Sequence, residues 1–139
     1  MRQQVLLDTG PLIALIDRRD HHHSWVTTEL ATIQPPLLSC EAVLSEAWFL
    51  LQRVNNGRET LVELLKSQQI LVAFQFNEEV ESITELLTRY RSVPISFADA
   101  SLVRMAEKYP GSEVLTLDSD FLIYRKHKNQ PISVIMPEV

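Results

Sequence analysis

The stretch Val5-Leu6-Leu7-Asp8-Thr9-Gly10-Pro11 contains three apolar residues, then an acid, then a Gly-Pro pair that interrupts regular structure. A short apolar run bounded in this way is typical of a strand buried on both faces, as in a parallel sheet. Ligands of open parallel sheets bind beyond the C-terminal ends of the strands. The stretch therefore predicts that Asp8 lies at a functional edge, although an Asp in this position is equally compatible with a turn or a helix start.

The same pattern recurs near the C-terminal end of the sequence, where the apolar run from Val114 to Leu117 leads into Asp118. The alternative for Asp118 is that it caps a short helix carrying Phe121. Two strands that each end in an acid would bring both carboxylates to one edge of a parallel sheet. This favours a shared site.

Two further acids are expected on the apolar sides of helices. Glu46 has apolar residues three and four positions away in both directions, which predicts that it lies on the buried stripe of a helix over residues 40–54. Asp99 is flanked at helical spacing by Ile95 and Leu102, although Ser96 and Asp99 also have the spacing of a capping box. Burying a lone carboxylate is costly unless something pairs with it, so both acids are site candidates.

Short apolar runs alternate with helical patterns along the whole chain. We expect strands at 5–7, 37–39, 70–74, 113–117 and 132–135, with helices between them, one of them capped by Asn77. This alternation predicts an α/β fold with a mainly parallel sheet. The length of 139 residues corresponds to a single domain, 1–139.

The composition is that of an ordinary globular protein with a net charge of −5. An acidic balance argues against a strong nucleic-acid binder unless some acids are gathered around a cation. No apolar run approaches the roughly 20 residues of a membrane span, and the N-terminus lacks the pattern of a signal peptide. With its single cysteine, Cys40, the chain is expected to be cytoplasmic and to make no contact with a membrane.

If Asp8, Glu46, Asp99 and Asp118 meet at one edge, with Asp120 as a possible fifth, they cannot all be ionised without a counter-charge. Oxygen ligands without a matching His or Cys set favour Mg²⁺ or Mn²⁺ over Zn²⁺. Carboxylate-bound Mg²⁺ is typical of phosphoryl transfer. The run from His21 to His23 is a poor metal tract, since successive helical residues point about 100° apart, and it is expected to be an exposed helix start.

At these positions the sequence resembles the PIN-domain ribonucleases, and within them the VapC-type toxins of toxin–antitoxin pairs. The stretches that carry the resemblance are Leu6–Leu12, Ala42–Ala47, Ser96–Leu102 and Leu115–Phe121. The resemblance implies an α/β/α sandwich, a metal-dependent endoribonuclease, a small antitoxin partner and a homodimer. It also implies an acidic quartet and, beside the metal, a hydroxyl and an additional acid, which here would be Asp8, Glu46, Asp99, Asp118, Thr116 and Asp120.

Basic residues beside such a site would hold the phosphate backbone of RNA. The candidates are Arg18, Arg19, Arg125, Lys126 and Lys128, each of which is equally compatible with a solvated helix end.

Other functions remain open at this point. A phosphatase with an Asp nucleophile would need a second Asp two residues after Asp8, where this chain has Gly10. A PIN-fold binding module without activity, or a housekeeping PIN nuclease without an antitoxin, would share the fold. The complete set of acids argues against the binding module.

Overall fold

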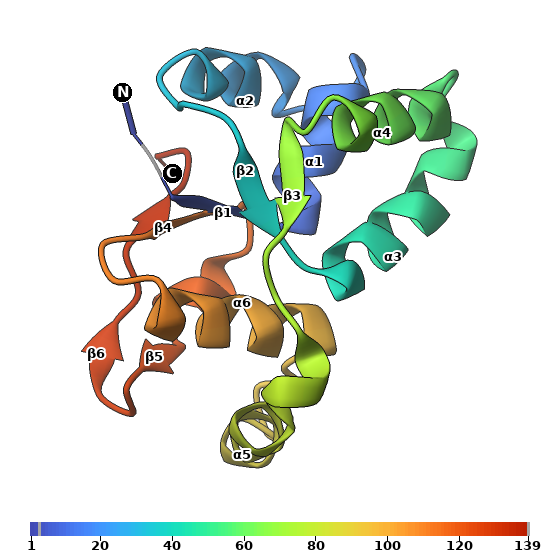
Figure 1. The fold of residues 1–139 in the computed structure, drawn as a ribbon. Helices are drawn as coiled ribbons and strands as arrows, with labels where there is room; N and C mark the ends of the chain where they lie inside the picture. The colour runs from blue at the N-terminus through green and yellow to red at the C-terminus, as the bar shows by residue number, and fades with distance from the viewer. Residues whose placement is uncertain (3, 139) are drawn as a thin grey trace.

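The computed structural model describes residues 1–2 and 4–138. Its centre is a five-stranded parallel sheet in the order β3-β2-β1-β4-β7 (Figure 1). The strands are β1 (Val5–Leu7), β2 (Leu37–Ser39), β3 (Ile70–Val72), β4 (Glu113–Leu115) and β7 (Val134–Ile135). Leu6 of the central strand pairs with Leu38 on one side and Val114 on the other. The predicted α/β class and parallel sheet are confirmed.

Helices cover both faces of this sheet. They are α1 (Thr9–Ile16), α2 (His23–Leu30), α3 (Glu41–Leu50), α4 (Gly57–Lys66), α5 (Val80–Arg89) and α6 (Phe97–Lys108), with 3-10 turns η1 (Leu51–Arg53), η2 (Phe76–Glu78) and η3 (Ser119–Leu122). Figure 1 shows α1, α2 and α4 on one side and α5 and α6 on the other, which is the expected α/β/α sandwich. Among the described residues, no helix is long and apolar enough to cross a membrane.

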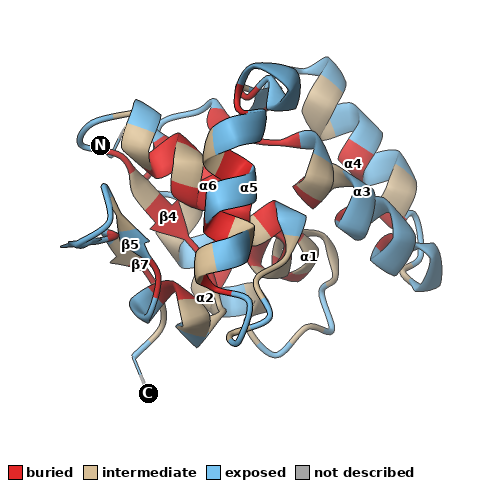
Figure 2. Ribbon diagram, turned by 90° about the horizontal axis from the view of Figure 1, so that it is seen from below, coloured by how far each residue is buried: buried red, intermediate tan, exposed pale blue. Residues whose placement is uncertain are grey.

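The sheet core follows from the apolar run at the start of the sequence. Val5, Leu6 and Leu7 are at most 1 % exposed, because α1 and α6 cover β1 from opposite faces. Helix α6 is largely buried (Figure 2), and in Figure 1 its N-terminal end lies on the side toward which β1 runs. The burial of β1 and α6 fixes the positions of Asp8, which follows β1, and of Asp99, which lies in the first turn of α6.

The prediction that Asn77 caps a helix is wrong. Residues Phe76–Glu78 form η2, and α5 begins only at Val80. Glu79 precedes the helix and is almost fully buried, with a carboxylate oxygen 3.3 Å from Arg104 Nε and 3.6 Å from Lys108 Nζ. These ion pairs hold the residue before α5 against α6, and a local capping rule cannot anticipate them.

After the fourth acid, the alternative of a solvated helix end for Arg125, Lys126 and Lys128 is wrong. Instead of a charged helix end, the chain forms an antiparallel hairpin of β5 (Arg125–Lys126) and β6 (Gln130–Pro131). His127 and Lys128 turn the chain with φ values of 49° and 69°, the left-handed region that usually selects Gly or Asn. The sequence therefore carries no recognisable turn signal here.

Candidate active site

Asp8 lies where β1 ends and α1 begins, and both of its carboxylate oxygens are held. Oδ1 accepts a hydrogen bond from the backbone N–H of Thr9 at 2.8 Å, and Oδ2 accepts one from the Thr116 hydroxyl at 2.7 Å. The Asp8 backbone N–H donates to the Leu115 carbonyl of β4 at 3.1 Å. Asp8 is therefore a helix cap and also part of the sheet edge, so the two alternatives for this residue hold together.

Thr116 connects Asp8 to the acid at the end of the neighbouring strand. Its hydroxyl oxygen accepts a hydrogen bond from the Asp118 backbone N–H at 2.9 Å while the hydroxyl donates to Asp8. Asp118 Oδ1 in turn accepts from the Asp120 backbone N–H at 2.9 Å and caps η3. Within the described part of the chain, the second oxygen of Asp118 makes no hydrogen bond.

Asp99 occupies the first turn of α6. Its backbone N–H donates to the Ser96 hydroxyl oxygen at 2.9 Å, so Ser96 is the cap of this helix. The Asp99 carboxylate instead accepts a hydrogen bond from the Tyr124 hydroxyl at 2.9 Å, and Tyr124 is fully buried. The helix cap therefore uses the backbone N–H of Asp99, and the side-chain carboxylate of Asp99 remains part of the site.

Glu46 is exposed, which corrects the prediction that it lies on a buried stripe. Its neighbours Phe49 and Leu50 are 64 % and 50 % exposed, because the second half of α3 extends beyond the sheet (Figure 1). Glu46 nevertheless reaches the site, since its Oε1 accepts a hydrogen bond from the Thr9 hydroxyl at 2.9 Å.

Electrostatics show that the four predicted acids are neighbours. Burial raises the pKa of Asp8 to about 6, and the charges of Asp99 and Asp118 add to this rise, against the hydrogen bonds from Thr116 and Thr9. Burial likewise raises the pKa of Asp99, and the charges of Asp118 and Glu46 act in the same direction.

Asp120 lies at the rim of this acidic group. Its charge contributes to raising the pKa of Tyr124 above the usual range, after burial of the phenol and the charge of Asp99. The fold thus brings the predicted quartet together and places the possible fifth acid beside it.

The donor set suits a divalent cation that keeps much of its water. Within residues 1–2 and 4–138, no three His, Cys, Asp or Glu side chains are arranged to hold an ion directly. Mg²⁺ is commonly bound by one or two carboxylates and several water molecules, so a full protein cage is not required. Oxygen-only donors and unrelieved repulsion around Asp8 fit such an ion.

Two residues of the site were not predicted from the sequence, Thr9 and Tyr124. Thr9 holds Glu46, and Tyr124 holds Asp99. Thr9 directly follows Asp8 in the sequence, and this proximity could have identified it as a residue of the site. Tyr124 is 25 positions from Asp99, so no local pattern pointed to it.

The predicted basic residues lie away from the acids. Arg18 and Arg19 follow α1, at the opposite end of that helix from Asp8. The hairpin with Arg125, Lys126 and Lys128 packs on the second half of α6, where the His127 backbone N–H donates to Glu107 at 2.6 Å. Glu107 is eight residues after Asp99, or about 12 Å along the helix.

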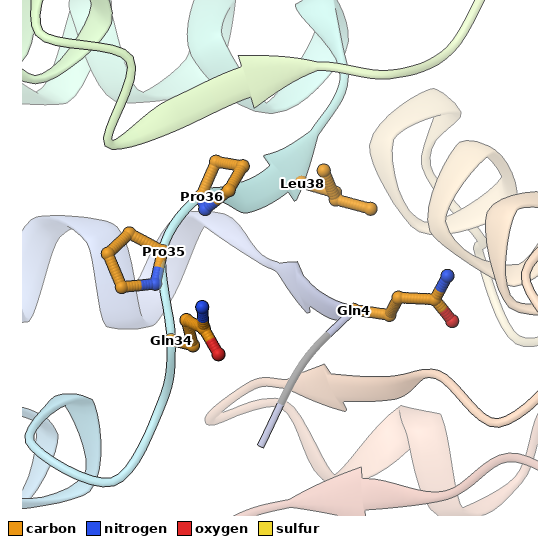
Figure 3. A pocket seen from close by; sticks show the side chains of 5 residues that line it. All are labelled: Gln4, Gln34, Pro35, Pro36 and Leu38. Atoms are coloured by element: carbon orange, nitrogen blue, oxygen red, sulfur yellow. The ribbon is translucent and has the colours of Figure 1, made fainter. Parts of the chain in front are cut away.

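A separate pocket of about 280 Å³ lies at the other edge of the sheet (Figure 3). It is lined by Gln4, Gln34, Pro35, Pro36 and Leu38. The first four precede β1 or β2, so the pocket opens at the N-terminal ends of these strands, away from Asp8. None of its lining side chains is ionisable, and it takes no part in the acidic site.

Comparison with known proteins places this fold in a class. The family model of the PIN domain matches residues 5–126, and the chain therefore belongs to the PIN-domain family. The structure is similar to that of VapC20 from Mycobacterium tuberculosis, described as a toxin that cleaves the sarcin–ricin loop. The TM-score is 0.67 and the identity 24 %, over 84 % of this chain and 91 % of that one. At this identity the likeness shows the fold. No curated protein matches the chain in sequence.

Proposed function

We propose that the chain is an endoribonuclease that depends on Mg²⁺ or Mn²⁺. The observation that carries the proposal is the meeting of Asp8, Glu46, Asp99 and Asp118 at the C-terminal edge of a parallel sheet, where burial and mutual repulsion raise the pKa of Asp8 to about 6. Membership of the PIN-domain family supports it. The similar structure, VapC20, is described as an RNA-loop-cleaving toxin, which supports RNA as the substrate.

In this proposal the acids hold the cation, and Asp99 and Asp118 are the candidates for direct contact because they are only half-buried. A bound Mg²⁺ supplies an activated water and stabilises charge on the phosphate oxygens. The neighbouring hydroxyl groups keep the acids in place before substrate arrives: Thr116 holds Asp8 and Tyr124 holds Asp99. Such preorganisation keeps a site productive, since a displacement of about 1 Å reduces activity strongly.

The decisive assay compares wild type with Asp8→Asn on a structured RNA, with Mg²⁺ and with EDTA. Asp8→Asn removes a charge at constant size, and we expect cleavage to fall by roughly 100-fold or more. Glu63→Gln, which removes an exposed acid of α4, is the matched control and should cleave like wild type. Equal cleavage by wild type and Asp8→Asn, or cleavage unaffected by EDTA, would refute the proposal.

We further propose that the enzyme is the toxin of a type II toxin–antitoxin pair acting in the cytoplasm, and that a small antitoxin restrains it. A basic side chain of the antitoxin that reached the acidic edge would meet several carboxylates, and such charge-assisted hydrogen bonds are strong. Expression of the chain alone should arrest bacterial growth. Asp118→Asn should remove the arrest at equal expression, and co-expression of a small neighbouring reading frame should restore growth. Normal growth with abundant wild-type protein would instead favour a housekeeping nuclease.

A homodimer is part of the same proposal. Phe76 and Phe97 are 40 % and 56 % exposed, and their rings contact each other with centroids 5.9 Å apart. Adjoining exposed aromatic side chains are typical of protein interfaces. Light scattering should give twice the chain mass, and Phe97→Ser should reduce it. A monomer at micromolar concentration would contradict this part.

A further inference from the structure

A groove of about 830 Å³ lies between the loop after α1 and the segment that joins α3 to α4. Three arginines line it, two from the loop (Arg18 and Arg19) and one from η1 (Arg53), and all three are exposed. Asn55 and Asn56 add neutral polar groups to the same wall. Three cationic side chains thus share one polar groove on a protein whose net charge is −5.

The three guanidinium groups are not used by the fold. In the part of the chain that the structure describes, none of them makes an ion pair or a side-chain hydrogen bond. The one acid in the lining, Asp17, accepts from the backbone N–H of Arg19 at 3.0 Å and not from its side chain. Arg104 shows the contrast, since Glu79 and Glu107 occupy its guanidinium. The arginines of the groove therefore remain available to an anionic ligand.

Two neighbouring elements connect this groove to the acidic site. Helix α1 leads from Thr9, beside the acids, to the loop with Arg18 and Arg19, and α3 leads from Glu46 to η1 with Arg53. The Thr9–Glu46 hydrogen bond joins the two helices at the acidic end. Arg53 lies seven positions after Glu46, which corresponds to about 10 Å of helix. Charges in a stacked strand are about 3.4 Å apart along its axis, so the separation corresponds to about three nucleotides.

We propose that this groove, defined by Arg18, Arg19 and Arg53, binds the phosphate backbone of the RNA substrate about three nucleotides from the cleaved bond. The inference rests on the proposed nuclease function and extends it to a second contact region. Arginine suits the task because its planar guanidinium forms paired hydrogen bonds with phosphate oxygens. Three such contacts outside the acidic edge would hold a chain that the carboxylates themselves repel.

The test uses full-length protein in the Asp8→Asn background and a fluorescent 12-nucleotide RNA, with a 4-nucleotide RNA for comparison. The variant replaces all three arginines by Gln. We expect its affinity for the long RNA to fall at least tenfold. The slope of log K against log salt should become shallower by about 2, or about 0.7 for each phosphate that the variant no longer neutralises. Arg91→Gln removes an exposed arginine outside the groove and should bind like the parent. Circular dichroism should show an unchanged fold.

Cleavage with Asp8 intact separates this inference from the proposed function. The preference for the long over the short RNA, as a ratio of kcat/KM values, should fall about tenfold in the triple variant and recover in part with three Lys instead of Gln. If wild type cleaves RNA and the triple variant shows the same affinity, salt slope and length preference, the groove inference alone is refuted. Arginine variants that lose only antitoxin binding would assign the groove to the protein partner and would also refute it. No RNA binding by the parent would refute both proposals.

Discussion

The most direct physical test of the acidic site is the stability of Asp8→Asn without metal. Asp8 is only 6 % exposed, and its pKa is raised to about 6, first by burial and then by the charges of Asp99 and Asp118. At pH 7.5 Asp8 is therefore ionised in the folded protein, although its ionised form has a lower free energy in the unfolded chain. Replacing it with the neutral amide of Asn should stabilise the fold even though it destroys the proposed site.

The magnitude follows from the pKa. A rise from 3.8 to about 6 makes the ionised Asp8 cost about 3 kcal/mol of unfolding free energy, at 1.36 kcal/mol for each pKa unit. Against this, the amide NH₂ of Asn cannot accept the hydrogen bond from Thr116, which costs about 1 kcal/mol. The net gain is about 2 kcal/mol at pH 7.5, or about 7 °C in Tm for a chain of 139 residues.

The sign depends on pH. Between pH 3.8 and 6 the folded state binds the Asp8 proton more tightly than the unfolded state, so the contribution of this group to wild-type stability falls as pH rises through that window. As the pH falls to 3.8 and below, the unfolded state also becomes protonated and the advantage of the variant disappears. Only the cost of the missing hydrogen bond then remains, about 1 kcal/mol.

Urea unfolding in EDTA at pH 7.5 and at pH 4 measures the stability difference between the variant and wild type at each pH. Glu63→Gln is the control and should match wild type at both. The expected result is a variant that is more stable than wild type at pH 7.5 and slightly less stable at pH 4. A variant that is less stable at both values by the same amount would show that the Asp8 carboxylate is a structural cap without an electrostatic penalty. The acids would then give a cation no repulsion to relieve.

Two other predictions concern the same site. Tyr124→Phe removes the hydroxyl that donates to Asp99, so unfolding free energy should fall by about 1 kcal/mol and RNA cleavage should fall with it; unchanged cleavage would show that this phenol does not position the acid. Mg²⁺ should raise the Tm of wild type, by the equivalent of about 2.7 kcal/mol at 100 times its Kd, and Asp99→Asn should both raise the metal-free Tm and reduce the response to Mg²⁺. An Asp99→Asn protein with the wild-type response would restrict Asp99 to a capping role.

The sequence was most informative where structure depends on short-range patterns. The apolar run at 5–7 predicted a strand buried on both faces, and β1 is fully buried. The acids that follow β1 and β4 lie at one sheet edge because parallel strands end on the same side. Ser96 was recognisable as a helix cap from its spacing to Asp99. Each of these patterns spans only a few residues, although the pairing of β1 with β4 that brings the two acids together joins distant segments.

The errors arise where distant segments determine the outcome. Periodicity placed Glu46 on an apolar stripe, but a periodic pattern carries no information on how far α3 extends beyond the sheet. Because the second half of α3 does extend beyond it, Phe49 is exposed. Glu79, the residue before α5, is held by ion pairs with α6. Tyr124 is brought to Asp99 only by the complete fold.

The choice between a structural and a functional interpretation of the acids was itself too narrow. Asp8 and Asp118 both cap the elements that follow them, and capping donors fix where a carboxylate lies without removing its charge. Around Asp8 those donors lower the pKa, yet burial and the neighbouring acids outweigh them. The caps therefore hold the acids close together against their repulsion, and a cation that relieves the repulsion would bind to an arrangement the fold already maintains. Ordinary helix capping thus provides the rigidity that the proposed nuclease site needs, at a cost in stability that Asp8→Asn measures.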